Sequence, residues 1–225
     1  FRVLHALSND ALPSPATPFF ERDPAVLDRP FYVMECLSGD VPVPAASADG
    51  RGPLDEDERL ALAPQIARTL AQLHAIDWHN LGFDFLEAPA PGKGAAVRQV
   101  ERWATRIAAS KLPVSPVLAE ALLWLRRHTP ESAEITLVHG DFRLGNILIE
   151  RAGAKTRLSG LLDWEMVHLG DPLEDLAWCS SLLWRAGGAN ASCLVPPDEL
   201  ARLYSEASGR TIDPVRFHFY DVLAL

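Results

Sequence analysis

Residues 137–149 of this 225-residue chain read LVHGDFRLGNILI, and this stretch decides the fold. Two short apolar runs, 135–138 and 146–150, flank a loop that carries Asp141 and, with four residues between, Asn146. Short runs of this kind predict strands, so the loop between them is held at both ends. We expect it to bring a carboxylate and an amide oxygen to one side. Such a pair can orient a hydroxyl group and bind a hard cation, which prefers oxygen ligands.

A second carboxylate follows at the end of the next predicted strand. The apolar run 158–163 ends at Asp163, and the region of Gly153 is expected to turn the chain between this strand and the preceding one. Three oxygen-bearing groups at strand ends suit phosphoryl transfer, in which a metal ion neutralises phosphate charge and one carboxylate positions the nucleophile. The spacing Asp-x4-Asn, followed by a strand-terminal Asp, matches the catalytic loop and metal loop of kinases.

The rest of the chain is expected to be mostly helical. Apolar residues at helical spacing and end signals predict helices at residues 2–7, 55–76, 97–109, 115–127, 172–183 and 198–208. Asp55 and Glu58 have the form of an N-terminal capping arrangement. The terminal run 217–225 is apolar and periodic as well.

The amino-terminal part is expected to form a separate region. Phe31-Tyr32-Val33-Met34 predicts a buried strand, and the Gly, Pro, Ala and Ser residues after it predict a boundary between lobes. We therefore expect the remnant of an N-terminal lobe with a hinge strand at 1–37, a linker at 38–54 and a helical lobe at 55–225. Because both ends lie inside apolar periodic runs, the sequence is expected to be a fragment cut at both ends.

The composition excludes several classes of protein. Hydrophobic residues make up 48% of the chain and charged residues 23%, which suits a folded core. No apolar run reaches the roughly 18–20 residues of a membrane span. The formal charge of −9 argues against a nucleic-acid surface. Cys36, Cys179 and Cys193 are too scattered for a disulfide framework or a zinc site, and they fit a reducing, cytoplasmic setting.

Together these motifs resemble the aminoglycoside phosphotransferase and choline kinase family, whose fold is like that of protein kinases. The segment 139–146 looks like its catalytic loop, LDWE at 162–165 looks like its metal loop, and LGDPLEDLA at 169–177 is also typical. With FYVME at 31–35, the chain is most like the branch found alone in bacteria or joined to acyl-CoA dehydrogenases. The resemblance implies an α+β, protein-kinase-like fold of two lobes, here mostly the helical C-terminal lobe with a truncated N-terminal lobe.

The resemblance also implies an activity and a set of site residues. It implies an ATP-dependent phosphotransferase that phosphorylates a hydroxyl group of a small molecule. Asp141 is then the catalytic base, or the group that orients the hydroxyl, and Asn146 and Asp163 are the magnesium ligands. The hinge backbone from Glu35 to Leu37, with Met34 before it, receives the adenine ring. The family's phosphate-covering loop and strand lysine are not in this sequence and are expected upstream.

Two further residues of the predicted catalytic loop have open roles. His139 is expected to brace the loop through a hydrogen bond rather than to transfer a proton. Arg143 could stabilise phosphate charge, or it could pair with an acidic loop residue and hold Asp141 in place. Asp171 and Asp175 are expected to cap and anchor the helix that follows them.

The remaining aromatic and histidine residues of interest have simpler interpretations. His74 is expected to be a packing histidine with its hydrogen bonds satisfied. Trp164 and Glu165 could contact substrate, or could serve as packing and as a salt-bridge partner. Four tryptophans in predicted helices are expected in the core, namely Trp103, Trp124, Trp178 and Trp184.

Two other functions remain as alternatives. A non-catalytic pseudokinase or interaction module is supported only by the missing nucleotide-binding lobe, and the intact Asp141, Asn146 and Asp163 argue against it. A protein kinase is disfavoured, because no activation segment ends in Ala-Pro-Glu and Trp164-Glu165 stands where protein kinases have Phe-Gly. The acceptor is left open between an aminoglycoside, a choline-like amine, a hydroxy acid and an acyl-linked alcohol, and the oligomeric state is open as well.

Overall fold

The computed structural model describes residues 1–7, 12–42, 53–111, 113–153 and 155–225. In these residues the chain is α+β, as expected, with helices around three small antiparallel sheets. Each sheet has two strands, which are β1 (Phe19–Glu21) with β2 (Phe31–Val33), β3 (Thr136–Val138) with β6 (His168–Gly170), and β4 (Ile147–Ala152) with β5 (Lys155–Leu161).

The six predicted helices are confirmed, with small changes at their ends. In chain order the α-helices are α1 (Arg2–Leu7), α2 (Pro24–Leu27), α3 (Glu56–His74), α4 (Gly94–Ala109), α5 (Pro116–Arg127), α6 (Leu173–Ser180), α7 (Pro197–Ser208) and α8 (Pro214–Leu223). Helix α6 is shorter than predicted because the backbone turns to an extended conformation at Ser181. A short 3-10 helix at Leu182–Trp184 follows it.

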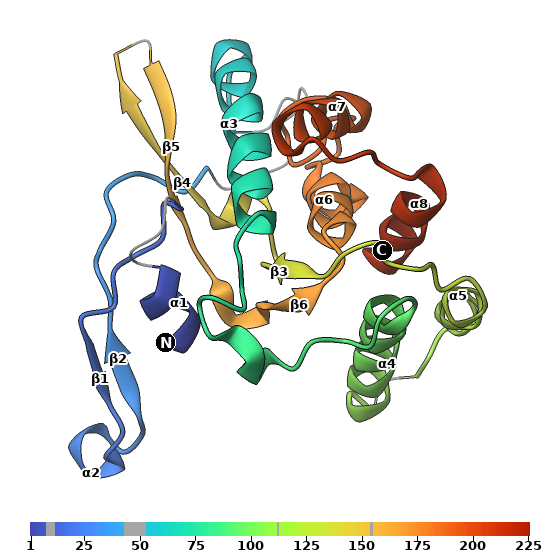
Figure 1. Ribbon diagram of the computed structural model, residues 1–225. Coiled ribbons are helices and arrows are strands. Elements are labelled where there is room, and N and C mark those ends of the chain that lie inside the picture. The colour runs from blue at the N-terminus through green and yellow to red at the C-terminus, as the bar shows by residue number, and fades with distance from the viewer. Residues whose placement is uncertain (8–11, 43–52, 112, 154) are drawn as a thin grey trace.

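Helix α3 lies between the β4–β5 hairpin and the α6–α7–α8 group (Figure 1). The predicted capping arrangement is confirmed, since Asp55 Oδ1 accepts a hydrogen bond from the Glu58 amide at 2.8 Å and the Glu58 carboxylate accepts one from the Asp55 amide. The helix buries Leu62, Ile66 and Leu70 at four-residue spacing toward the core. Helix α3 packs against β5, α7 and β3, the strand that leads into the predicted catalytic loop.

The β4–β5 hairpin is joined to both α3 and the segment after β2. Gln65 of α3 donates to the Thr156 carbonyl and accepts from the Leu158 amide, both at 3.0 Å, and so pairs with the edge of β5. Asp40 exchanges two backbone hydrogen bonds of 2.9 Å with Ile149 of β4. Residues 38–42 of the predicted linker therefore run beside the hairpin, whereas residues 43–52 lie outside the described residues. The predicted domain boundaries stay a prediction.

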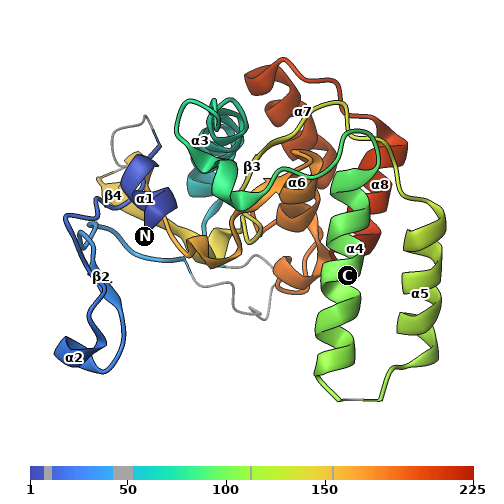
Figure 2. The same cartoon turned by 60° about the horizontal axis from the view of Figure 1, so that its bottom comes forward.

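The strand of the predicted hinge exists, but the prediction that it is buried is wrong. Tyr32, Val33 and Met34 expose 40%, 46% and 51% of their surface. Among the described residues, strand β2 pairs with β1 alone, and a two-stranded ribbon leaves side chains exposed unless another element packs on them. The ribbon and α1 lie together at the amino-terminal side of the molecule, away from α4 and α5 (Figure 2).

The strands on either side of residues 139–146 belong to different sheets. Strand β3 pairs with β6, in a register that sets Leu137 opposite Leu169, and β4 pairs with β5. Strand β6 has only three residues and was not predicted. Its antiparallel register sets His168 opposite Val138, so the residues just before β6 lie beside the loop that follows β3.

Two expectations from composition can be compared with the described residues. No helix among them is long and apolar enough to cross a membrane. All three cysteines are free thiols, with Cys36 exposed and the other two buried.

Candidate active site

Asp141 lies in the loop after β3, three residues beyond the end of the strand, and its carboxylate is the acceptor for three neighbouring side chains. Asn146 Nδ2 donates to Oδ2 at 2.6 Å, and Trp178 Nε1 donates to Oδ1 at 2.7 Å. Arg143 Nε lies 3.1 Å from Oδ1 and 3.3 Å from Oδ2. The side chain is 14% exposed, so the carboxylate is fixed by its partners while one edge still faces solvent.

Asn146 and Asp163 are brought to neighbouring positions by the backbone. The Leu162 amide donates to the Asn146 carbonyl at 2.8 Å, and Asp163 is the next residue along. Asn146 is buried, and its Nδ2 also donates to the Asp141 carbonyl at 2.9 Å. Asp163 is exposed and has a left-handed backbone, with φ 65° and ψ 60°.

Asn146 and Asp163 fit a magnesium ion better than a metal that takes all of its ligands from the protein. Because Asn146 Nδ2 is bonded to Asp141, the amide oxygen Oδ1 is the atom left to bind a cation, and Asp163 supplies a carboxylate. Magnesium typically keeps several waters and takes one or two protein ligands together with substrate phosphates. Within the described ranges, no group of three or more His, Cys, Asp or Glu residues could hold a metal ion.

The backbone of the loop is anchored by Asp175, for which a different role was predicted. The Asp175 carboxylate accepts hydrogen bonds from the backbone amides of His139 at 2.7 Å and Gly140 at 2.8 Å. It also meets His74 Nε2 at 3.3 Å, and both side chains are fully buried. Asp175 therefore fixes the catalytic loop rather than capping α6. The capping prediction is confirmed for Asp171, which accepts from the Leu173 amide at 2.9 Å.

The charge of Asp175 is stabilised by this network. Burial alone would raise the pKa of the Asp175 carboxyl, but the hydrogen bond and charge of His74, with further help from His139, lower it overall. His74 Nδ1 meets the Tyr204 hydroxyl at 2.8 Å, so both ring nitrogens of His74 have partners. The prediction that His74 is a satisfied packing histidine is confirmed.

His139 is buried beneath the loop, with both ring nitrogens engaged. Its Nδ1 accepts from the Asp141 amide at 3.2 Å, and its Nε2 donates to the Leu162 carbonyl at 2.9 Å. Burial lowers the pKa of His139, which keeps the imidazole neutral. With no exposed surface, the ring ties the catalytic loop to the end of β5, and this geometry supports the bracing role over proton transfer.

Gly140 is the position at which the loop requires a glycine. Its φ of +82° lies in the left-handed region, and a Cβ there would come within 2.6 Å of the Met166 carbonyl oxygen. The close approach brings the catalytic loop and the segment after Asp163 into contact.

Arg143 adopts the second of the two roles that the sequence left open. Its guanidinium pairs with Asp141 and lies over the Trp184 ring, 4.4 Å from the ring centroid. Trp178, in contrast, was predicted to be a core residue, and that prediction is wrong. It is only partly buried, and its indole N–H bonds Asp141. The three-residue spacing places Asp175 and Trp178 on one face of α6, but no pattern in the sequence indicates what that face contacts.

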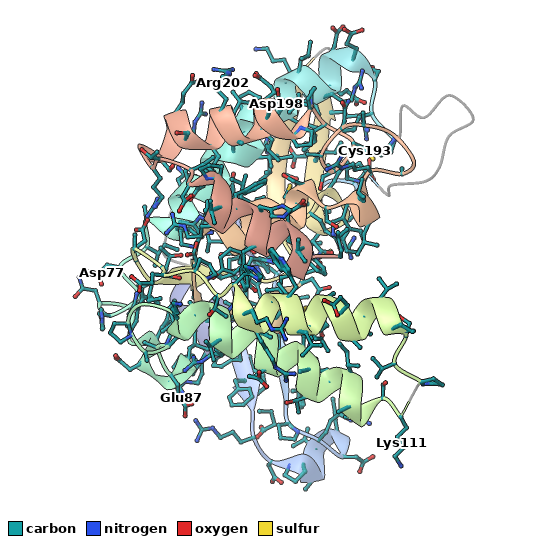
Figure 3. All side chains as sticks on the ribbon, turned by 90° about the vertical axis from the view of Figure 1, so that its right-hand side faces the viewer. Asp77, Glu87, Lys111, Cys193, Asp198 and Arg202 are labelled. Atoms are coloured by element: carbon teal, nitrogen blue, oxygen red, sulfur yellow. The ribbon has the colours of Figure 1, made fainter. Side chains whose placement is uncertain are left out.

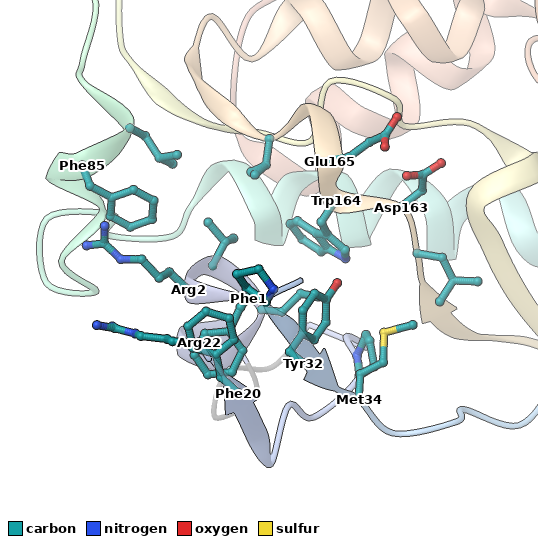
Figure 4. Close-up of a pocket in the computed structure, with 17 residues that line it drawn as sticks. Phe1, Arg2, Phe20, Arg22, Tyr32, Met34, Phe85, Asp163, Trp164 and Glu165 are labelled. Carbon is teal, nitrogen blue, oxygen red and sulfur yellow. The ribbon is translucent and has the colours of Figure 1, made fainter. Parts of the chain in front are cut away.

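A pocket of about 1250 Å³ lies between the metal-loop residues and the amino-terminal elements (Figure 4). Asp163, Trp164 and Glu165 line one side, and Tyr32 and Met34 are among the residues that line the other. Trp164 also packs into the core, at 7% exposure, and donates to the Leu161 carbonyl at 3.0 Å. The packing interpretation of Trp164 is therefore confirmed, and contact with substrate stays a prediction.

The three residues predicted to receive adenine differ in their positions. Met34 lines the pocket, whereas Glu35 and Leu37 are not among its lining residues. The Glu35 amide donates to the Ala16 carbonyl at 2.8 Å. Leu37 turns toward β5, where its Cδ1 would lie 2.8 Å from a Cβ added at Gly160.

Comparison with known proteins identifies the family. A model described as the phosphotransferase enzyme family matches residues 1–218. The chain belongs to this family. Acyl-CoA dehydrogenase family member 11 of Rattus norvegicus is 35% identical over 185 residues, which are 80% of this chain and 22% of that protein. Acyl-CoA dehydrogenase family member 10 of Mus musculus is 31% identical over 180 residues, 79% of this chain and 16% of that protein. The chain thus spans about a fifth of the length of these relatives.

The solved structures that resemble this phosphotransferase-family chain share its kinase-like fold. A crystal structure from Ralstonia eutropha described as "a putative aminoglycoside phosphotransferase" has a TM-score of 0.78 and 26% identity, with 99% of this chain and 69% of that chain covered. Aminoglycoside-3'-phosphotransferase of type VIII has a TM-score of 0.68 at 21% identity, with 98% and 76% covered. The wild-type aminoglycoside 2'-phosphotransferase-IIIa, solved as a GDP complex, has a TM-score of 0.66 at 15% identity, with 99% and 70% covered. The family and the fold that the sequence motifs implied are confirmed.

Proposed function

We propose that this chain carries the catalytic site of an ATP-dependent phosphotransferase that transfers a phosphoryl group to a hydroxyl of a small molecule. The observation that carries the proposal is the arrangement around Asp141. One carboxylate, held by three donors yet open at one edge, lies in the same loop as Asn146 and beside the end of β5, where Asp163 faces the pocket.

In this proposal Asp141 is the group that meets the acceptor. Its carboxylate accepts a hydrogen bond from the substrate hydroxyl and receives the proton as the hydroxyl oxygen forms its bond to phosphorus. The bond between phosphorus and the leaving ADP oxygen breaks at the same centre. Holding the hydroxyl in line with the phosphate is the main contribution of such a residue, because positioning and charge stabilisation supply most of the catalysis in phosphoryl transfer.

The nucleotide side of the site is assigned to the pocket between Asp163 and Met34. Asn146 Oδ1 and the Asp163 carboxylate would hold a magnesium ion, which when bound neutralises charge on the phosphates. The apolar and aromatic residues around Met34 and Tyr32 suit a planar base. The GDP complex of aminoglycoside 2'-phosphotransferase-IIIa supports a nucleotide site in this fold, although the identity of 15% carries only the fold across.

Arg143 is the donor to Asp141 that can leave. Its single Nε–H is shared between both carboxylate oxygens at 3.1 and 3.3 Å, whereas Asn146 and Trp178 make shorter bonds to one oxygen each. A substrate hydroxyl that displaces Arg143 replaces it as a hydrogen-bond donor to the Asp141 carboxylate. The freed guanidinium can then face phosphate oxygens. Both roles predicted for Arg143 are thereby combined.

The proposal is tested by magnesium-dependent release of ADP from ATP by the intact protein that contains this chain. The acceptor panel covers aminoglycosides, choline-like amines, hydroxy acids and acyl-linked alcohols. We expect one class to stimulate release, and Asp141→Ala to lower the stimulated rate by about 10³-fold, in the range of general acid–base residues. Asp163→Ala should lose the magnesium dependence.

A matched control is Asp198→Ala, which removes an exposed carboxylate on α7 (Figure 3) and should leave the rate unchanged. A stable Asp141→Ala protein with full activity would refute the role of Asp141. An intact protein that binds no nucleotide would favour the non-catalytic pseudokinase instead.

A further inference from the structure

Helix α6 contacts the catalytic loop at two points. Asp175 binds the backbone amides of His139 and Gly140, and Trp178, three residues further along, binds the side chain of Asp141. Residues three apart lie on the same face of a helix, so one helix fixes both the backbone of the loop and the carboxylate that it presents. The first contact anchors the backbone of the loop, and the second holds one oxygen of the carboxylate.

The three donors to Asp141 differ in how firmly they are held. Asn146 is buried just before β4, and Trp178 lies on a helix whose inner face is buried. Arg143 has a flexible side chain that is 23% exposed. When a substrate hydroxyl displaces Arg143, Asn146 still holds Oδ2 and Trp178 still holds Oδ1. The indole N–H is then the only remaining side-chain donor, among the described residues, that fixes Oδ1.

The surroundings of Trp178 keep its ring in one place. The ring lines a crevice of about 20 Å³ with Trp103, Gly140 and Met166. A space of this size is on the scale of one water molecule, so it cannot take a substrate group. Trp184 packs beside the ring, with centroids 5.5 Å apart. Trp178 is therefore packed on several sides, and its polar atom is directed at Asp141.

We propose that Trp178 is a positioning residue, whose indole N–H holds the Asp141 carboxylate in the orientation that receives the acceptor hydroxyl. The inference rests on the proposed phosphotransferase activity. It assigns the N–H itself, not the bulk of the ring, as the functional part of the side chain. Trp184 provides a contrast, because its buried indole nitrogen has no hydrogen-bond partner in the described part of the chain and its ring face carries Arg143.

Two substitutions separate the N–H from the ring. Trp178→Phe keeps an aromatic ring and removes the donor. Trp178→His keeps a donor, because histidine Nε2 occupies the same place along the side chain as tryptophan Nε1, two bonds beyond Cγ. We expect Trp178→Phe to lower kcat at least tenfold, since a hydrogen bond to a charged group is lost. Trp178→His should recover most of that loss, and the KM for ATP should stay within about twofold in both.

The matched control is Trp124→Phe. It makes the same chemical change on α5, where the ring stacks on His128 rather than facing the loop, and it should leave kcat unchanged. Thermal melting of each variant, with its Kd for ATP, separates a folded but slow enzyme from a damaged one. A direct readout is the ¹⁵N–¹H resonance of the Trp178 indole, which should shift on Asp141→Ala.

Three results would overturn the role of Trp178, and a fourth would refute the proposed function as well. A kcat for Trp178→Phe equal to that of the wild type overturns the inference while the proposed function stands. Equal losses in the Phe and His variants also overturn it, because packing would then be the cause. If the indole resonance does not shift in Asp141→Ala, Trp178 does not donate to Asp141, and the inference is overturned as well. A wild-type protein without phosphotransferase activity refutes the proposed function, and the inference falls with it.

Discussion

The catalytic loop and the hinge segment are both expected to contact the nucleotide or its acceptor, yet the chain holds them very differently. The loop is fixed by buried side chains from two helices, Asp175 of α6 and His74 of α3, and by His139 beneath it. The hinge strand β2 pairs only with β1 among the described residues, and both its Tyr32 and the following Met34 are exposed.

This difference separates the part of the site that is already formed from the part that depends on further contacts. Groups that position a reacting atom need fixed geometry, and buried hydrogen-bond networks provide it. A surface that receives a planar base needs shape more than exact hydrogen-bond geometry. Substitutions in the loop should therefore affect stability and rate together, whereas substitutions in the hinge should affect only nucleotide binding.

The largest effect is expected for Asp175→Ala. The change leaves two buried amides and His74 without their acceptor, and we expect the free energy of unfolding to fall by about 3–5 kcal/mol, as for other broken buried pairs. Urea denaturation followed by tryptophan fluorescence measures the loss. Asp213→Ala is the control, because Asp213 caps α8 at the surface and a cap contributes about 1 kcal/mol. Equal losses in the two variants would contradict the special role of Asp175.

A smaller effect is expected for Gly140→Ala. The added Cβ meets both a left-handed φ of +82° and the Met166 carbonyl at 2.6 Å. Backbone strain and overpacking together should cost about 2–4 kcal/mol and slow turnover, because the loop must shift. Gly153→Ala measures the cost of backbone strain alone. The φ of Gly153 is +62°, but no atom from elsewhere in the fold lies within 4 Å of the added Cβ. Equal denaturation midpoints for Gly140→Ala and Gly153→Ala would show that Met166 moves aside without a cost in stability.

A further effect of intermediate size is expected in the pH dependence of stability, which arises at His139. Because its pKa is lowered in the folded protein, the unfolded chain binds the proton more tightly, and stability falls as the pH drops below the unfolded value of about 6.5. The loss is about 1.4 kcal/mol for each pH unit, until the lowered folded pKa is reached. His139→Gln should remove this slope, and its stability at pH 8 reports the packing cost alone. An unchanged slope would show that His139 is not the titrating group.

The sequence predicted those features that depend on local pattern. The capping pair of Asp55 and Glu58, the helical spacing in α3 and the hairpin turn near Gly153 each follow from residues close in the chain. The residues proposed around Asp141 were found in the same way, because the Asp-x4-Asn spacing fits a short loop.

The features that the sequence did not predict depend on contacts between residues that lie far apart in the chain. Trp178 and Asp175 bind a loop that lies more than 30 residues earlier, and no periodicity reports such a contact. Strand β6 is too short to have a pattern of its own and forms because β3 offers an edge. The burial of β2 was overestimated because an apolar composition does not specify which element covers a strand.

The smallest effect on stability is expected at the hinge, for Met34→Ala. Met34 is 51% exposed, so its truncation should lower the free energy of unfolding by no more than about 0.5 kcal/mol. The same change removes apolar surface from the pocket that is proposed to receive the base, and the KM for ATP should rise about three- to tenfold. Val26→Ala is the control, because Val26 is similarly exposed but does not line the pocket. A KM that stays constant would remove the hinge from the nucleotide site. A large loss of stability would instead show that the hinge is held as firmly as the loop, and the contrast between the two regions would fail.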